Sequence, residues 1–426
     1  MPSDSIAYFG KTNFRREDKT FGIKLPDRRQ HVYIIGKSGT GKSTLIKNLI
    51  IQDIRSGRGV GLLDPHGDLV EDILNYIPSS RTGEVVYFNP ADQEFPIGFN
   101  ILESIEDGFK PLVASSLISV FKNIWNDSWG PRLEYILYNA VAALLDYEST
   151  TLLAIPRLLE NKKFRALVIE KIQDPLVKNF WVQEYEKYSS EFRKEAISPI
   201  QNKVGQFLTS APIRNILSQV KSKIEMGFIM DNRRIFLCNL AKGKMGEDKT
   251  NLLGSLIMTK MFLAGLKRVE RREDSRKDFF LYIDECQSFA TSILGSMLSE
   301  ARKYRINLTL THQYLGQLSE EVKKSIIGNV GTLISFRLGS HDASELEKEF
   351  SPQFSIENLE NLGKYQIYLK LLIDGLPSRP FSAQTLPPAT PNKNEGNKEN
   401  IIKSSRQKYG TRRELIEDRI NRWLNS

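Results

Sequence analysis

The segment GKSGTGKS at residues 36–43 constrains the fold of this chain more than any other feature. It follows the apolar run VYII and precedes TLIKNLIIQDIRS, which has the length and periodicity of a helix. The spacing GxxxxGKS between a strand and a helix is the signature of a P-loop. A strand, a glycine-rich turn and a helix are therefore expected as consecutive elements of an α/β domain.

The residue types of this segment suit the phosphates of a nucleoside triphosphate. Its glycines let backbone N–H groups turn toward phosphate oxygens, and the start of the helix adds the positive end of its dipole. Lys42 is expected to reach the β- and γ-phosphates, and the hydroxyl of Ser43 is expected to ligate Mg²⁺. The candidate binding residues are Gly36, Lys37, Ser38, Gly39, Thr40, Gly41, Lys42, Ser43 and Thr44.

Short apolar runs alternate with helix-length amphipathic stretches from residue 32 onward, which is typical of a mainly parallel sheet covered by helices. Nearly continuous hydrophobicity in VYII, FFLYID and NLTLT predicts central strands that are buried on both faces. The predicted strands are Val32 to Ile35, Gly59 to Asp64, Glu84 to Phe88, Arg234 to Asn239, Phe279 to Asp284, Asn307 to Thr311 and Thr332 to Arg337.

Two adjacent acids close one of these strands. A P-loop enzyme needs a carboxylate beside its magnesium ion and a base that orients the attacking water. The run FFLYIDE supplies Asp284 for the magnesium, held through water, and Glu285 for the water. The alternative explanation is an ordinary strand that happens to end in acids.

Polar side chains also end two other predicted strands, at the edge where α/β proteins bind their ligands. Gln313 follows NLTLT, and it either senses the γ-phosphate or satisfies the loop that it begins. Asp64 closes the strand in GLLDPHGD, and it either faces the P-loop or, like Asp68, caps the next helix.

The hydrophobic pattern changes between residues 103 and 230, where helical periodicity replaces runs of β-branched residues. An all-helical insertion domain is therefore expected to interrupt an α/β core formed by residues 1–102 and 231–382, with a hairpin turning at Asp374 and Gly375. Residues 383–404 predict a flexible linker because they are rich in Pro, Asn, Lys and Glu. Residues 405–426 predict a helix with a capping box at Thr411 and Glu414, which either docks on the chain's own core or binds a partner.

Charge, cysteine content and the length of apolar runs limit the partners and the cellular compartment that suit this chain. The formal net charge of +9 is compatible with a polyanionic partner such as nucleic acid. Cys238 and Cys286 are the only cysteines and lie in apolar runs, which favours a reducing compartment over a disulfide framework. No segment approaches the roughly 20 apolar residues of a membrane span, and the N-terminus lacks an apolar signal core. A cytoplasmic protein is expected, attached to the inner membrane, if at all, through membrane or secretion-channel partners.

Several segments occur in one order along the chain: GKSGTGKS, LLDPHGDLVEDIL, WGPRLEYILYNAVAALL, LCNLAKGKMGEDKTNLLGSLI, FLYIDECQSFA, EARKYRINLTLTHQ and ISFRLGSHDASEL. This order resembles the FtsK/HerA superfamily of ring-shaped DNA-pumping ATPases, particularly the TraG/TraD-like conjugative coupling and type IV secretion branch. The resemblance covers roughly residues 20 to 382.

The resemblance implies a RecA-like core that binds ATP and Mg²⁺ and assembles into a homohexamer with ATP at the subunit interfaces. It also implies that a neighbouring subunit donates an arginine, for which Arg302 in EARKYRIN is the first candidate and Arg337 in ISFRLGS the second. The alternative for either arginine is a surface or interface ion pair. Lys242 and Lys244, after IFLCN, are candidates for a loop that tracks DNA phosphates, the alternative being a solvated loop or a subunit contact.

The chain departs from membrane-bound coupling proteins in one respect, because they begin with transmembrane helices whereas this chain reaches its P-loop after 35 residues. The function expected from the sequence is an ATP-hydrolysing ring that translocates DNA. The alternatives are a type IV secretion ATPase that moves protein and a nucleotide-controlled recruitment adaptor.

Overall fold

The computed structural model describes residues 5–13, 18–103, 105–125 and 128–425. The chain divides into two compact units. The first, which we call the sheet unit, consists of Met1–Phe88, Met226–Ala241 and Met261–Ser405. The second, the helical unit, consists of Asn89–Glu225, Lys242–Lys260 and Arg406–Ser426. The expected insertion at 103–230 overlaps the first helical segment, and we propose that the two units are the domains of the chain.

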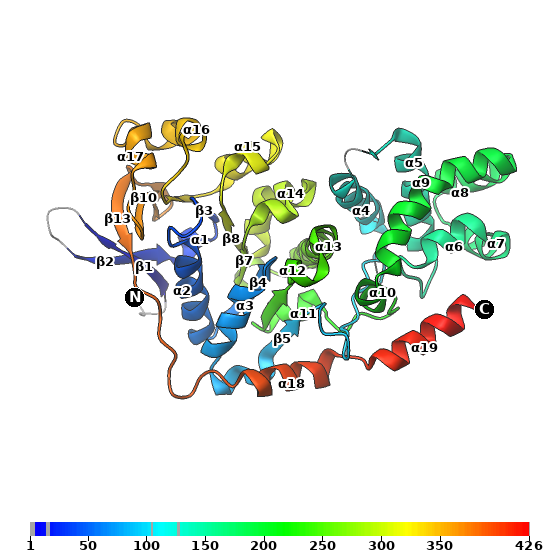
Figure 1. Ribbon diagram of the computed structural model, residues 1–426, viewed down its shortest axis with the longest axis horizontal. Helices are drawn as coiled ribbons and strands as arrows, with labels where there is room; N and C mark the ends of the chain where they lie inside the picture. The colour runs from blue at the N-terminus through cyan, green and yellow to red at the C-terminus, as the bar shows by residue number, and fades with distance from the viewer. Residues whose placement is uncertain (1–4, 14–17, 104, 126–127, 426) are drawn as a thin grey trace. The chain divides into compact units, whose positions relative to one another are not determined.

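An 11-stranded sheet forms the sheet unit, in the order β2-β1-β13-β10-β9-β3-β8-β7-β4-β6-β5 (Figure 1). The strands from β9 to β5 pair in parallel, and β2, β1, β13 and β10 pair antiparallel. Their bounds are β1 Ile6–Thr12, β2 Thr20–Lys24, β3 Val32–Ile35, β4 Gly59–Asp64, β5 Val85–Phe88, β6 Ile235–Asn239, β7 Phe279–Ile283, β8 Ile306–His312, β9 Thr332–Ser335, β10 Gln366–Lys370 and β13 Phe381–Thr385. The mixed α/β fold with a mostly parallel sheet is confirmed.

Every residue of the parallel strands is buried, as their continuous hydrophobicity predicts. The predicted strands are confirmed, with ends that differ by at most two residues. Strands β1 and β2 were not predicted, because glycine and lysine interrupt their short apolar stretches and only part of each strand is buried. The hairpin is confirmed: β11 Leu372–Ile373 and β12 Leu376–Pro377 are joined by Asp374 and Gly375, both with positive φ.

Helices of the sheet unit cover the sheet. Helix α2 leaves the P-loop and packs beside α3 in front of β4 (Figure 1). The bounds are α1 Leu25–Arg28, α2 Lys42–Arg55, α3 Asp68–Ile73, α11 Met226–Asp231, α14 Ser292–Glu300, α15 Glu320–Asn329, α16 Ser340–Phe350 and α17 Ile356–Glu360.

A buried charge cluster lies beneath the inner face of α2. Asp53 accepts hydrogen bonds from both terminal nitrogens of Arg28 at 2.7 and 2.8 Å, from Arg58 at 2.7 Å and from the Tyr282 hydroxyl at 2.6 Å. The Arg28 guanidinium also lies 4.0 Å from the centre of the Phe280 ring. Burial by itself would raise the pKa of the Asp53 carboxyl, but the two arginines outweigh burial and lower that pKa. The cluster therefore ties α1 and α2 to β7 through a fully compensated carboxylate.

The helical unit packs around aromatic side chains, among them Phe180, Trp181 and Tyr185, whose rings contact one another. Its elements are α4 Lys110–Ile124, α5 Pro131–Leu145, α6 Ala154–Glu160, α7 Lys162–Lys171, α8 Pro175–Asn179, α9 Ser190–Thr209, α10 Ala211–Leu217, α12 Lys242–Met245 and α19 Arg413–Leu424. Helix α13 (Glu247–Leu266) begins in this unit and ends in the sheet unit.

The C-terminal segment differs from its prediction at several points. Residues 383–385 belong to β13, and α18 (Lys398–Tyr409) begins inside the expected linker. Between them the chain is held on α2, where Asn48 donates to the Pro387 carbonyl at 2.9 Å and Arg55 pairs with Glu395 at 2.8 Å. A composition rich in Pro and Asn does not reveal these contacts, because they depend on side chains more than 300 residues away.

The capping box expected for α19 is wrong, since its N-cap is Arg412 and no side chain there bonds to the backbone. Among the apolar residues of α19, Ile416 and Ile420 are buried whereas Leu415 and Leu424 are exposed. Arg157 donates to the Trp423 carbonyl at 2.8 Å, and its guanidinium lies over the Trp423 ring. Within the helical unit, α19 therefore docks on the chain itself, which was the first of the two alternatives.

In the part of the chain that the structure describes, no helix is both long enough and apolar enough to span a bilayer.

Replacing Asp53 by Asn is expected to destabilise the protein by about 3–5 kcal/mol, because Arg28 stays buried without its counter-charge. Urea unfolding at neutral pH measures the loss. Since the pKa of Asp53 is lowered, its contribution is present above the ordinary carboxyl pKa and is lost as the pH falls through the folded-state pKa. The difference between wild type and variant should therefore shrink below about pH 4.

The matched control is Asp274→Ala, which removes an ion pair with Arg272 in which both side chains are exposed. Its cost should stay below about 1 kcal/mol. Equal destabilisation by the two variants would contradict the role assigned to the buried cluster.

Candidate nucleotide-binding site

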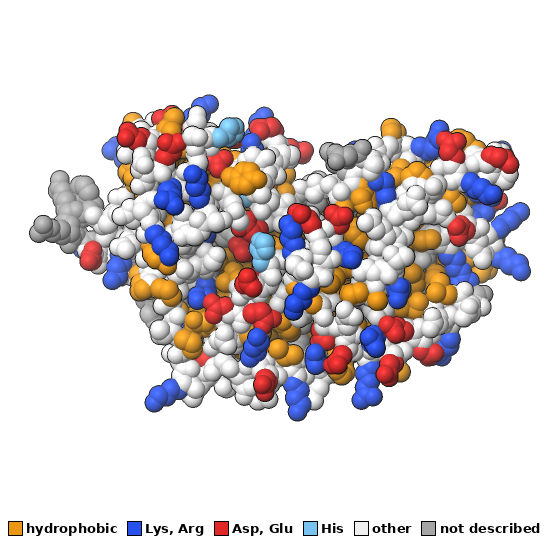
Figure 2. Space-filling view, in the orientation of Figure 1, with side chains coloured by type: hydrophobic (Ala, Val, Ile, Leu, Met, Phe, Trp, Pro, Cys, Tyr) orange, Lys and Arg blue, Asp and Glu red, His pale blue; other side chains and the backbone are white. Residues whose placement is uncertain are grey.

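A polar pocket opens at the carboxyl ends of β3, β4, β7 and β8, where parallel strands place their loops. The space-filling view shows acidic side chains gathered in a hollow beside α2 and α3, with basic side chains near its rim (Figure 2). The pocket is lined by Ser38, Gly39, Gly41, Lys42, Ser43, Thr44, Lys47, Asp64, His66, Asp68, Leu69, Asp72, Asp284, Glu285, Gln313, Lys364 and Tyr365. The structure thus brings most of the sequence-predicted site residues together.

The P-loop turns between β3 and α2 with positive φ at Gly36, Gly39 and Gly41. The Lys42 ammonium donates to the backbone carbonyls of Gly36 and Lys37, the second at 3.1 Å. Burial lowers the pKa of Lys42, although Glu285 and Asp284 oppose this shift. A buried ammonium held by two carbonyls at the start of a helix is a ready site for an anion.

Three predicted P-loop residues do not line the pocket. The Gly36 backbone N–H donates to the His312 carbonyl at 3.3 Å, and that of Lys37 donates to the Arg337 carbonyl at 2.9 Å. The Thr40 hydroxyl donates to the Lys37 carbonyl at 2.7 Å. These residues hold the loop in shape between the neighbouring strands β8 and β9.

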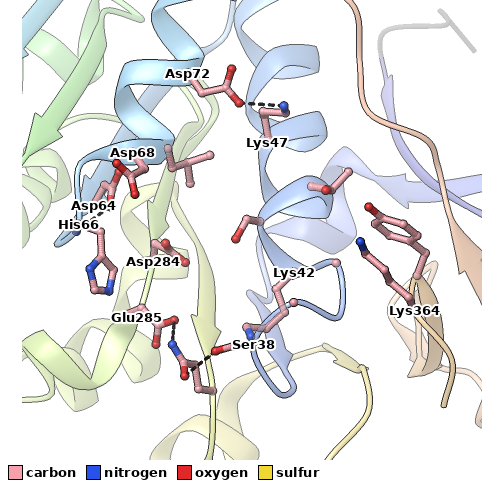
Figure 3. Close-up of a pocket in the computed structure, with 17 residues that line it drawn as sticks. Ser38, Lys42, Lys47, Asp64, His66, Asp68, Asp72, Asp284, Glu285 and Lys364 are labelled. Atoms are coloured by element: carbon pink, nitrogen blue, oxygen red, sulfur yellow. Dashed lines mark hydrogen bonds and ion pairs between the residues drawn. The ribbon is translucent and has the colours of Figure 1, made fainter.

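Asp284 and Glu285 follow β7 and face the P-loop across the pocket (Figure 3). The Thr311 hydroxyl donates to Asp284 Oδ1, and the Glu285 backbone N–H donates to the same hydroxyl at 3.2 Å. Burial, with the nearby carboxylates of Asp64 and Glu285, raises the pKa of Asp284 to about 6. Glu285 is buried and has a φ of 47°, an uncommon left-handed conformation for a glutamate.

Both carboxylate oxygens of Glu285 accept hydrogen bonds from side-chain amides. Gln313 Nε2 donates to Oε1 at 2.6 Å, and Gln287 Nε2 donates to Oε2 at 2.9 Å. The Ser38 hydroxyl in turn donates to Gln313 Oε1 at 2.9 Å (Figure 3). A continuous path of hydrogen bonds therefore links the P-loop to the acidic strand end.

Asp64 lies between the pocket and the turn into α3, whose N-cap is Gly67. It lines the pocket, and its carboxylate accepts from the backbone N–H groups of His66 at 2.9 Å and Val70 at 3.0 Å. Burial raises the pKa of Asp64, while these backbone donors oppose the shift. It therefore shapes the turn into α3 at the wall of the pocket.

Several pocket residues were not predicted from the sequence. His66, Asp68 and Asp72 lie in or just after the motif DPHGD, so the turn that marked Asp64 was a usable signal for them. Gln287, which contacts Glu285 but does not line the pocket, lies two residues after it and carries no motif of its own. Lys364 and Tyr365 reach the pocket from the start of β10, more than 300 residues from the P-loop, and no local pattern indicates them.

The two candidate arginines lie at opposite ends of the parallel strands. Arg302 precedes β8 and is exposed at the amino-terminal edge, so it lies away from the pocket of its own chain. Arg337 follows β9 at the edge that carries the pocket, and its side chain is exposed but does not line the pocket.

The segment with Lys242 and Lys244 is not the loop that the sequence suggested. Residues 242–245 form the short helix α12, and Lys242 pairs with Glu247 at 2.8 Å. Lys244 is exposed. Gly246, which follows the helix, takes a positive φ.

The residues present fit a magnesium ion that arrives with phosphates. Within the described ranges, no three His, Cys, Asp or Glu side chains converge as a metal-binding cluster. Magnesium bound to nucleotides takes only one or two protein ligands, and Ser43 and Asp284 line the same pocket. Burial and then the neighbouring carboxylates raise the pKa of Asp284, and a cation beside it would offset both.

Residues 20–353 match the family model of the type IV secretion-system coupling protein DNA-binding domain. The chain belongs to this family. No curated protein sequence matches the chain significantly.

Solved structures share the fold. The bacterial conjugative coupling protein TrwBdeltaN70 aligns with a TM-score of 0.64 at 14% identity over 88% of each chain. TrwB in complex with the ATP analogue ADPNP aligns with a TM-score of 0.62 at 15% identity, over 87% of this chain and 88% of that one. VirB4 of Thermoanaerobacter pseudethanolicus aligns with a TM-score of 0.61 at 14% identity, over 91% and 97% of the two chains.

Gly41→Ala is expected to disrupt the P-loop. A Cβ atom there would lie 2.7 Å from Tyr365 Cδ1 and 3.1 Å from Phe336 Cε1, and the φ of 124° strains any side chain. Gly39→Ala is the matched control, because its φ of 76° carries strain but no atom lies within 4 Å. The control should cost about 1–2 kcal/mol of unfolding free energy and Gly41→Ala clearly more. Equal losses in urea unfolding would contradict the tight packing of Gly41.

Proposed function

We propose that this chain hydrolyses ATP with Mg²⁺ and, as a ring of identical subunits, moves DNA. The observation that carries the proposal is the hydrogen-bonded path from Ser38 through Gln313 to Glu285, which joins a P-loop to a carboxylate suited to activate water. Membership in the coupling-protein DNA-binding family supports DNA as the partner. Solved TrwB complexes with ADPNP and with ADP and Mg²⁺ support the nucleotide and the ion.

The P-loop and three other polar residues of the pocket then have roles in phosphoryl transfer. The P-loop backbone and Lys42 hold the phosphates, and Lys42 exchanges its carbonyl partners for phosphate oxygens. Ser43 and Asp284 would hold Mg²⁺, which would supply positive charge beside the phosphate oxygens. Glu285 orients the attacking water and accepts its proton. Gln313 couples the P-loop to Glu285, because its side-chain amide contacts both Ser38 and Glu285.

The position of Arg302 supports a shared site. Strand β8 is seven residues long, so Arg302 lies roughly 20 Å from the pocket of its own chain. An arginine at one edge of the sheet and a pocket at the other fit a head-to-tail arrangement, in which each subunit completes the site of the next. We propose Arg302 as the trans arginine of a homohexamer. Arg337, whose backbone contacts the P-loop of its own chain, fits a role within one subunit.

A second candidate is a secretion ATPase that moves protein. The pairing of Lys242 with Glu247 favours it, because one of the two lysines proposed to track DNA phosphates is already neutralised. ATP hydrolysis that rises with DNA, together with DNA binding that weakens steeply with salt, would favour the motor that moves DNA.

Glu285→Gln is expected to lower kcat of ATP hydrolysis by about 100-fold or more while ADP binding stays near the wild-type value, since the base is lost and the phosphate site remains. Steady-state ATPase assays with and without single- and double-stranded DNA measure the effect. Retained hydrolysis in the variant would contradict the role of Glu285. A wild-type rate indifferent to both forms of DNA would remove DNA as the substrate.

Mixing two inactive variants tests the trans arginine. Glu285→Gln and Arg302→Ala should each be inactive alone, whereas their mixture should regain activity at roughly a quarter of the interfaces, those that combine an intact Glu285 with an intact Arg302. Lys303→Ala, at the next exposed position, is the control and should keep wild-type activity. Failure of the mixture to recover, with assembly confirmed, would contradict a shared site.

A further inference from the structure

Tyr365 is held in a strained conformation against the P-loop. Its φ of 66° lies in the left-handed region, which is a genuine outlier for an aromatic residue. Its backbone N–H donates to the Thr40 carbonyl at 2.9 Å, and its carbonyl accepts from the Thr385 N–H at 2.9 Å. Strand β13 and the P-loop therefore maintain this conformation, and such strain is typical of positions that serve a ligand.

The pocket has two distinct ends. Glu285 and Gln313 mark the end at which the γ-phosphate must react, on one side of the P-loop (Figure 3). Lys364 lies on the opposite side of the start of α2. A nucleoside triphosphate is elongated, so phosphates that lie along the P-loop direct the sugar and base toward Lys364 and its neighbour Tyr365, which also line the pocket.

The Tyr365 side chain suits contact with a sugar and base. It carries the only phenyl ring among the described residues that line the pocket, and it is partly exposed. One part of the ring packs on Gly41, and the exposed Lys364 ammonium lies 5.0 Å from the ring centre. An aromatic ring offers a π-face to any base, and stacking does not require hydrogen bonds to the base edge.

We propose that Tyr365, with Lys364 beside it, binds the nucleoside half of the substrate by stacking, and that purine nucleotides are accepted with little discrimination between adenine and guanine. This inference rests on the proposed nucleotide-binding function of the same pocket.

The experiment separates phosphate binding from nucleoside binding. Calorimetry with the full chain and Mg²⁺ measures the Kd of ADP, GDP and tripolyphosphate, which carries phosphates without a nucleoside. The variants are Tyr365→Ala, Tyr365→Leu, which keeps an apolar side chain on Gly41 without a π-face, and Tyr365→Phe. Tyr368→Ala is the matched control, because Tyr368 lies on β10, just after Tyr365, but stacks on Phe354 and does not line the pocket.

Tyr365→Ala and Tyr365→Leu should weaken ADP and GDP by about 5- to 150-fold and leave tripolyphosphate within about threefold of wild type. Tyr365→Phe and Tyr368→Ala should bind all three ligands like wild type. Wild type should bind ADP and GDP within about fivefold of each other.

Equal weakening of ADP and tripolyphosphate in both the Ala and Leu variants would overturn the inference, because Tyr365 would then act only by supporting the P-loop. Unchanged ADP binding in the Leu variant would also overturn it. Wild-type protein that binds neither ADP nor tripolyphosphate would instead overturn the proposed function of the pocket. Thermal unfolding of each variant shows whether it is folded, and the conservative Leu variant decides if the Ala variant is not.

Discussion

Parallel pairing of β8 with both β3 and β7 is the constraint on which the rest of the structure depends. The register sets Ile35 opposite His312 and Ile283 opposite Leu310, so these strands end at one level. Gln313 and Glu285 follow within two residues of these ends, which places them beside the P-loop. Because side chains alternate along a strand, a slip of one residue in this pairing would turn the Gln313 and Glu285 side chains to the opposite face of the sheet.

The site combines shifted pKa values and strained backbone conformations, and it is built on a tightly packed sheet. Asp284 has a raised pKa, Lys42 has a lowered one, and Glu285 and Tyr365 hold left-handed conformations. Phosphates and a divalent cation would relieve the charges, since they supply the counter-charges that the pocket lacks. Compensated charges elsewhere, such as the cluster around Asp53, stabilise the scaffold that tolerates this strain.

Local signals predicted much of the fold and the phosphate end of the site. The P-loop, the parallel strands and the hairpin at Asp374 were predicted because period, glycine positions and turn chemistry act over a few residues. Three features were not predicted or were predicted wrongly: the edge strands β1 and β2, the cap of α19 and the helix α12. Strand β1 and the start of α19 depend on contacts outside their own segments, with β13 and with residues 94–96, and such contacts override weak local preferences.

The sequence by itself determined that the chain has a P-loop followed far downstream by an acidic strand end, because both signals are short and contiguous. Only the tertiary structure decided how these parts are connected. The amides of Gln313 and Gln287 hold Glu285, Arg302 lies at the opposite edge of the sheet, and Tyr365 packs on Gly41. The physical reason is that strand pairing joins residues hundreds of positions apart, and the order of strands in a sheet is set by the packing of the whole core rather than by any single segment.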